Sequence, residues 1–171
     1  ALLSAPRFSS LLLTFYQDRL DPEHEMQFSA LTVLLDTGEA LLVFRGTDNT
    51  LVGWKEDFNL SFLEVVPAQS AALDYTAQLA AAHPCPLLLA GHSKGGNLAV
   101  FSASLSPPEL RDRIGTVYSY DSPGFTQRVL SAPGYQELLP RIRSYVPQSS
   151  VVGMLLEHEE PYTVVKSRHL G

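Results

Sequence analysis

Residues 86–99 constrain the fold of this chain more than any other part of the sequence. Residues 86–90 form a short apolar run that is typical of a buried parallel strand, and apolar side chains recur at helical spacing after it. Between the two stands Gly91-x-Ser93-x-Gly95, the pattern of a nucleophile elbow, which holds a serine in a strained turn at the tip of a strand. We therefore predict strand, sharp turn and helix, with Ser93 at the turn.

The two glycines of this pattern have a steric reason, because a Cβ at Gly91 or Gly95 would collide with the strand or the helix. Ser93 would lie at the N-terminal end of the helix, where backbone N–H groups can stabilise an oxyanion. Two other interpretations are open. A phosphate-binding loop fits the spacing of Gly91 and Gly96, but Asn97-Leu98 stands where that loop carries Lys-Ser or Lys-Thr. An ordinary Gly-rich turn without chemistry is the second.

Length and composition limit the class of protein. At 171 residues, the chain suits one domain, residues 1–171, with a hydrophobic core. The net charge of −6 and the scattered basic residues argue against a nucleic-acid partner. The single cysteine, Cys85, excludes an internal disulfide, and we expect it to be buried. No apolar run is long enough to span a membrane, so we expect a cytoplasmic protein without a transmembrane segment. Because the sequence starts at Ala1 and stops soon after strand-like residues, we expect both ends to be truncated.

The periodicity of apolar residues predicts strands that alternate with helices. Strands are predicted at 10–17, 27–36, 39–45, 86–90, 114–120, 142–146 and 162–166. Helices are predicted at 67–83, 107–113, 126–130 and 135–139, in addition to the helix after the elbow, and Asp21-Pro22-Glu23 predicts one helical turn. A tight turn at 36–39 predicts an antiparallel hairpin, and the later alternation predicts a mainly parallel sheet.

Residues 47–60 form a segment of mixed character near the predicted site. Leu51, Trp54 and Phe58 recur at helical offsets, which predicts a short amphipathic helix. Two roles are open for it: Trp54 and Phe58 fill the core, or the helix acts as a mobile lid.

A serine nucleophile needs a base, and the chain has five histidines. His24 and His83 are interpreted as structural, and His92 is expected to point away from Ser93 because neighbours at an elbow face opposite ways. His158 and His169 remain, and both follow Ser93 in the Ser, Asp, His order of hydrolases of this type. His158 falls in an acidic surface run, and at this point both histidines stay open as the base.

Asp121 is the candidate for the acid that orients the base. It follows the strand after the elbow strand, at the sheet edge where sites form in parallel sheets. The alternative is that it only caps the turn Ser122-Pro123-Gly124. Metal-binding signatures are absent, and Glu157-His158-Glu159-Glu160 is interpreted as a solvated surface turn.

Several longer motifs carry a resemblance to known families. The order of Val43-Phe44-Arg45-Gly46-Thr47, Trp54-x-x-Asp57 and the elbow resembles the class 3, fungal-type lipases. The amino-acid sequences of four segments more closely resemble a bacterial lipase-like family called Mbeg1-like: residues 44–50, 91–97, 121–125 and 146–153.

The resemblance implies an α/β-hydrolase fold: a mainly parallel sheet entered by an antiparallel hairpin, with helices on both faces. It also implies Ser93 as the nucleophile and an oxyanion hole made by Thr47 with the backbone N–H of Lys94. Two departures from the family pattern matter. Ser149-Ser150 stands where class 3 lipases carry the acid, and the Gln-His-Asp of the Mbeg1-like family does not occur before Gly171.

We therefore predict a serine hydrolase acting on small-molecule or lipid carboxylic esters. Its catalytic residues would be Ser93, Asp121 and His169, with Thr47 and Lys94 in the oxyanion hole. The resemblance puts the base after the strand at 162–166, where His169 stands, and a histidine beyond residue 171 is the alternative. No cofactor and no metal are needed for this chemistry. The alternative function is a catalytically silent hydrolase fold used as a binding module.

Overall fold

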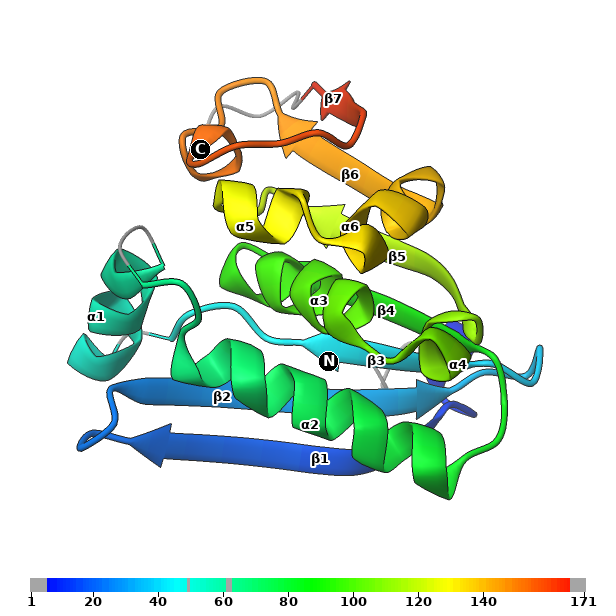
Figure 1. The fold of residues 1–171 in the computed structure, drawn as a ribbon. Coiled ribbons are helices and arrows are strands. Elements are labelled where there is room, and N and C mark those ends of the chain that lie inside the picture. Colours follow the sequence, from blue (N-terminus) through cyan, green and yellow to red (C-terminus); the bar gives the residue numbers. More distant parts are fainter. Residues whose placement is uncertain (1–5, 49, 61–62, 167–171) are drawn as a thin grey trace.

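The protein is built around a seven-stranded sheet whose spatial order follows the chain, from β1 to β7 (Figure 1). The computed structural model describes residues 6–48, 50–60 and 63–166. The strands are β1 (Leu12–Asp21), β2 (Met26–Leu34), β3 (Ala40–Phe44), β4 (Leu87–His92), β5 (Ile114–Tyr120), β6 (Ile142–Pro147) and β7 (Tyr162–Val165). The pairs β1–β2 and β2–β3 are antiparallel, and the pairs from β3 to β7 are parallel. This confirms the predicted hairpin entry into a mainly parallel sheet.

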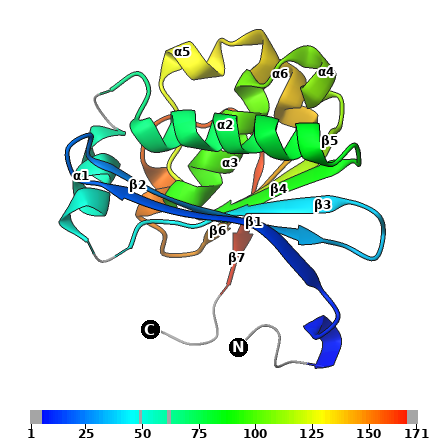
Figure 2. The same cartoon turned by 90° about the horizontal axis from the view of Figure 1, so that it is seen from below.

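The helices lie between the strands in sequence: α1 (Leu51–Asn59), α2 (Pro67–Ala82), α3 (Lys94–Leu105), α4 (Pro108–Arg111), α5 (Gln127–Leu130) and α6 (Pro133–Leu138). Figure 2 shows α2 to α6 on one side of the sheet. Helices on both faces were expected, and the described residues place the helical layer on one. The reason is topological: crossovers between parallel strands are right-handed, and the strand order never reverses, so every crossover passes over the same face.

The core lies between this helical layer and the sheet. Ala68 and Ala72 of α2 are fully buried, and such small side chains let the helix approach the strands closely. The Tyr75 ring packs against Phe28 and Phe44, with ring centres 6.0 and 5.8 Å away. These aromatic contacts fix α2 against β2 and β3, next to the strand that leads to Ser93.

The turn between β1 and β2 corrects one prediction. Asp21 ends β1 instead of starting a helix, and its Oδ1 accepts hydrogen bonds from the N–H groups of Glu23 (3.1 Å) and His24 (3.2 Å). An aspartate that captures the N–H groups two and three residues ahead is common to helix caps and to turns. The aspartate was therefore correctly recognised as a capping residue, but the pairing of β1 with β2 makes this segment a turn and not the start of a helix.

Candidate active site

Ser93 lies in a sharp turn between β4 and α3. Its backbone has φ 55° and ψ −130°, a conformation that non-glycine residues adopt only under strain, at about 1–3 kcal/mol. Its N–H donates to the carbonyl oxygen of Tyr120 at the end of β5 (2.9 Å). The side chain is half-buried and stands at the N-terminal end of the 12-residue helix α3.

Two close backbone approaches hold this turn. A Cβ on Gly91 would lie 2.1 Å from the carbonyl carbon of Gly95, and a Cβ on Gly95 would lie 2.2 Å from the carbonyl oxygen of Phe44. Real Cβ atoms do not come this close, so the strand and the helix can approach each other here only if both residues are glycine. The steric role predicted for both glycines is confirmed.

A cavity of about 110 Å³ opens in front of Ser93. Its lining combines residues of α1, the Ser93 turn and two loops: Asp57, Leu60, Ser93, Lys94, Pro123, Val152, Leu155 and Leu156. Apart from Asp57, Ser93 and Lys94, these are aliphatic side chains or proline. The cavity thus offers an apolar space next to one hydroxyl group and one carboxylate.

Thr47 follows Gly46, which packs against the Ser93 turn where the chain leaves β3. The preceding residue fixes this approach, because a Cβ on Gly46 would lie 2.8 Å from the His92 carbonyl oxygen and 3.5 Å from the Ser93 Cβ. The Thr47 hydroxyl donates to the Asp57 carboxylate, with Oγ1 2.6 and 2.5 Å from its two oxygens. Burial raises the pKa of Asp57, and the hydrogen bond from Thr47 offsets only part of that rise. The hydroxyl that the resemblance assigns to an oxyanion is therefore already engaged.

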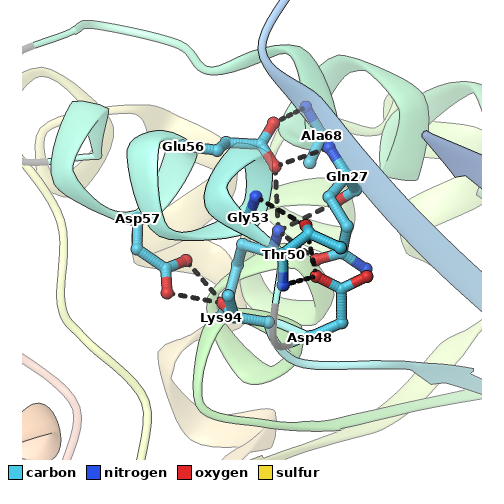
Figure 3. A network of polar contacts seen from close by, with 9 residues as sticks. Gln27, Asp48, Thr50, Gly53, Glu56, Asp57, Ala68 and Lys94 are labelled. Carbon is cyan, nitrogen blue, oxygen red and sulfur yellow. Dashed lines mark hydrogen bonds and ion pairs between the residues drawn. The ribbon is translucent and has the colours of Figure 1, made fainter. Parts of the chain in front are cut away.

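A buried polar network lies directly behind the turn (Figure 3). The Lys94 Nζ donates to the Gln27 carbonyl oxygen (2.8 Å), to Gln27 Oε1 (2.7 Å) and to Glu56 Oε2 (2.8 Å). The Glu56 carboxylate also accepts the backbone N–H groups of Gln27 (3.0 Å) and Ala68 (2.8 Å). The side chains of Lys94 and Glu56 are 1% and 0% exposed. The network joins β2 with the starts of α2 and α3 and with α1.

The orientation of α1 is the reverse of the one that its apolar residues suggest. Leu51 and Trp54 are 82% and 65% exposed, whereas Gly53 and Glu56 are buried. Trp54 therefore does not fill the core, and the Phe58 side chain lies outside the described part of the structure. The helix itself was predicted correctly, but it faces the protein with the side that carries Glu56.

Asp121 directly follows the end of β5, as predicted, and has an unusual φ of 49°. Its Oδ1 accepts hydrogen bonds from the Ser150 hydroxyl and from the Gly153 N–H (3.1 Å). Asp121 therefore lies next to Ser150. Asp121 lines a second cavity of about 400 Å³, together with His92 and six further residues that do not include Ser93. Its role as the acid stays a prediction.

The histidines divide into three situations. His169 lies outside the described residues, so its role stays a prediction. His92 is exposed beside the Asp121 cavity. His158 is half-buried, with Nδ1 2.9 Å from Glu160 Oε1, and the Tyr135 hydroxyl donates to Glu160 Oε2 (2.7 Å). Glu157 and Glu159 are exposed as expected for a solvated turn, whereas Glu160 is buried, so the expectation for the run 157–160 is only partly correct.

Sequence reasoning missed the polar residues that surround the turn. Asp57 was noted as part of a motif but received no role, and Glu56 and the Lys94 side chain received none. The signal for Asp57 was its spacing from Trp54 along the sequence in the Trp54-x-x-Asp57 motif. Glu56 had no signal of its own, because an acid in a short amphipathic helix ordinarily faces solvent.

Among the residues that the structure describes, no three His, Cys, Asp or Glu side chains are placed to hold one metal ion. Within the same residues, no helix combines the length and the apolar character that crossing a bilayer requires.

Comparisons with known proteins agree with this geometry. A family model described as Mbeg1-like matches residues 2–171. A search of curated proteins gave no match. The native Rhizomucor miehei lipase propeptide complex is similar in structure, with a TM-score of 0.66 at 15% identity, covering 91% of this chain and 57% of that one. A triacylglycerol lipase from Penicillium expansum has a TM-score of 0.54 at 12% identity, over 90% of this chain and 70% of that one. The chain thus spans less than two thirds of the Rhizomucor protein, and at such low identity the similarity shows an α/β-hydrolase fold of the lipase type.

Proposed function

The chain belongs to the Mbeg1-like family, and from this premise and its lipase-like fold we propose that it is a serine hydrolase that cleaves carboxylic esters through an acyl-enzyme on Ser93. The observation that carries the proposal is the turn itself. Ser93 is kept in a strained conformation, at a helix N-terminus and on the wall of an apolar cavity. A fold retains such strain where the resulting geometry has a use.

In the proposed reaction, Ser93 Oγ attacks the carbonyl carbon of an ester while its proton passes to an imidazole base. The carbonyl oxygen becomes an oxyanion, which the backbone N–H groups of Lys94 and Thr47 would stabilise, because the Thr47 hydroxyl donates to Asp57. The bond from carbon to the leaving oxygen then breaks, and the alcohol takes the proton from the imidazolium. Water repeats these steps on the acylated serine and releases the acid.

Asp121 and His169 are the proposed acid and base. Within the described residues, the hydrogen bonds to the Asp121 carboxylate go to Oδ1, which leaves Oδ2 for an imidazole. The cavity beside Asp121 is also lined by Val165 and Lys166, the last described part of the chain before His169. This route favours His169 over His158, whose Nδ1 is engaged by Glu160.

A fluorophosphonate probe and p-nitrophenyl butyrate test the proposal. The wild-type protein should be labelled on Ser93 and should turn over the ester. Ser93→Ala should abolish labelling and lower turnover by about 10³-fold or more, with an unchanged circular dichroism spectrum. Full activity in Ser93→Ala would assign the reaction to another residue. Asp121→Asn should retain labelling only weakly, and full activity in that variant would remove Asp121 from the proposal.

A catalytically silent binding module is the second candidate. The observation in its favour is the Thr47 hydroxyl, which donates to Asp57 instead of standing free for an oxyanion. A folded wild-type protein that neither reacts with the probe nor hydrolyses short-chain esters would support this candidate.

A further inference from the structure

The residue next to the proposed nucleophile carries a buried charge that the reaction does not use. Lys94 follows Ser93 directly, and its ammonium group is surrounded by three acceptors, on Gln27 and Glu56. Because each ammonium hydrogen has an acceptor, the side chain can occupy only this one arrangement. These hydrogen bonds thereby hold the backbone of Lys94 in place through Gln27 and Glu56, which do not line the cavity.

Glu56 connects the same charge to α1. Its carboxylate binds Lys94 through Oε2, and Oε1 accepts the N–H of Ala68 in the first turn of α2. The carboxylate therefore satisfies one of the N–H groups that a helix start leaves without an acceptor. The position of α1 is fixed from two directions, by α3 through Lys94 and by α2 through Ala68.

The position of α1 also determines the surroundings of Thr47. Asp57 follows Glu56 and accepts the Thr47 hydroxyl. Gly53 packs directly on Thr47, since a Cβ there would lie 2.9 Å from Thr47 Cγ2. A shift of α1 would consequently move both neighbours of Thr47 at once.

Stability alone does not account for this pair. Replacing a buried ion pair with well-packed apolar residues is often neutral or stabilising, because the cost of removing two charges from water offsets their attraction. What an ion pair with five hydrogen bonds adds over an apolar contact is a fixed position and orientation. Both elements that it fixes, the start of α3 and α1, border Ser93.

We propose that the buried Lys94–Glu56 pair positions the two oxyanion donors of this site, holding the Lys94 backbone N–H directly and Thr47 through Asp57. Lys94 and Glu56 are positioning residues in this scheme, because the Lys94 ammonium binds Gln27 and Glu56, neither of which lines the cavity. The inference rests on the proposed ester hydrolysis.

The test is a double variant, Lys94→Met with Glu56→Gln, which removes both charges together and keeps the side-chain volumes. Oxyanion contacts are made in the transition state, so kcat should fall about 10-fold to 100-fold with KM within about twofold. The rate of fluorophosphonate labelling should fall in parallel. The matched control is Arg111→Met with Glu137→Gln, an ion pair at the other end of α3 whose arginine is 8% exposed, and it should leave kcat unchanged.

Gly53→Ala provides a second variant that leaves the charges in place. Its added Cβ pushes on Thr47 and should give the same loss of kcat without a change in KM. If the double variant does not fold, the kcat of Gly53→Ala decides the question. Wild-type kcat in a folded double variant, or in Gly53→Ala, would overturn the positioning role while leaving ester hydrolysis intact. A wild-type protein without labelling or turnover would overturn the proposed function, and the positioning role with it.

Discussion

The Ser93 cavity has two walls that are held in place by different chemistry. On one side, α1 is fixed by the Lys94–Glu56 pair, which is almost completely buried. On the other side, Val152, Leu155 and Leu156 belong to the loop between β6 and β7. This loop is held at its start by the bond from Ser150 to Asp121 and at its end by the bond from the Tyr135 hydroxyl of α6 to Glu160, which also pairs with His158. Each wall thus has an ion pair, but only the second pair contains a histidine.

The difference lies in how each wall responds to pH. The hydrogen bond to Glu160 raises the pKa of His158, although burial acts in the opposite direction. Burial would raise the pKa of Glu160, but hydrogen bonds from His158 and Tyr135 outweigh it, so that this pKa is lowered. Histidine changes its charge near neutral pH, so the loop wall is the one that pH can loosen. The comparison shows how one cavity can combine a fixed wall with an adjustable one.

The largest effect is expected from Lys94→Met alone. It leaves the Glu56 carboxylate buried without its cation, which should lower the free energy of unfolding by about 3–5 kcal/mol. Urea denaturation measures this. Lys55→Met, on α1 beside Glu56, is the control, because the Lys55–Glu25 pair is exposed and its loss should leave stability unchanged. Equal effects of the two substitutions would contradict the fixed wall.

The next largest effect concerns Thr47. Thr47→Val removes the hydroxyl that binds Asp57 and leaves that half-buried carboxylate without its donor. Because the bond to Asp57 would hold the Thr47 backbone N–H at the oxyanion, we expect kcat for ester hydrolysis to fall about 100-fold with little change in KM. Thr37→Val, in the exposed turn before β3, is the control. An unchanged kcat would move the oxyanion donor elsewhere.

His158→Gln tests the adjustable wall, with an expected loss of about 2 kcal/mol in the free energy of unfolding. Since the folded-state pKa of His158 is raised, its contribution is present below the unfolded pKa and is lost as pH rises through the folded pKa. For Glu160, whose pKa is lowered, the contribution is present above the unfolded pKa and is lost as pH falls through the folded pKa. The stability difference between wild type and variant should therefore shrink from mildly acidic to alkaline pH. A difference that does not vary with pH would contradict the titration.

The smallest effect is expected at the start of the loop. Ser150→Ala removes a hydroxyl that donates to Asp121 and accepts the Gly153 N–H (2.8 Å), and should cost about 1 kcal/mol. Thermal unfolding can resolve this against Ser149→Ala, whose side chain is exposed. A loss as large as that of Lys94→Met would mean that this bond, and not His158, holds the loop wall.

Local patterns in the sequence were sufficient to predict the sheet and the Ser93 turn. The strand at 114–120 was predicted with its observed bounds, and the glycines at 91 and 95 had the predicted steric role. Both signals depend only on neighbouring residues. The single helical layer could not be predicted in the same way, because it follows from the order of strands in space.

The polar surroundings of Ser93 were missed for a related reason. Glu56 and Lys94 are 38 residues apart, and Tyr135 meets Glu160 only after the loop has folded over α6. A charged side chain ordinarily lies on the surface, so its burial depends on a partner that the local sequence does not reveal. Because α1 turns Glu56 toward the protein, its apolar residues Leu51 and Trp54 are exposed instead.

The chain-ordered sheet also determines how this protein can be assembled during synthesis. Each strand from β2 onward pairs with the strand made immediately before it, so the sheet can grow at one edge as the chain emerges from the ribosome. The Ser93 turn is complete once the Tyr120 carbonyl has arrived, whereas Ser150, Val152 and Leu155 come later. A nascent chain would therefore form the Ser93 turn before the loop wall of its cavity exists.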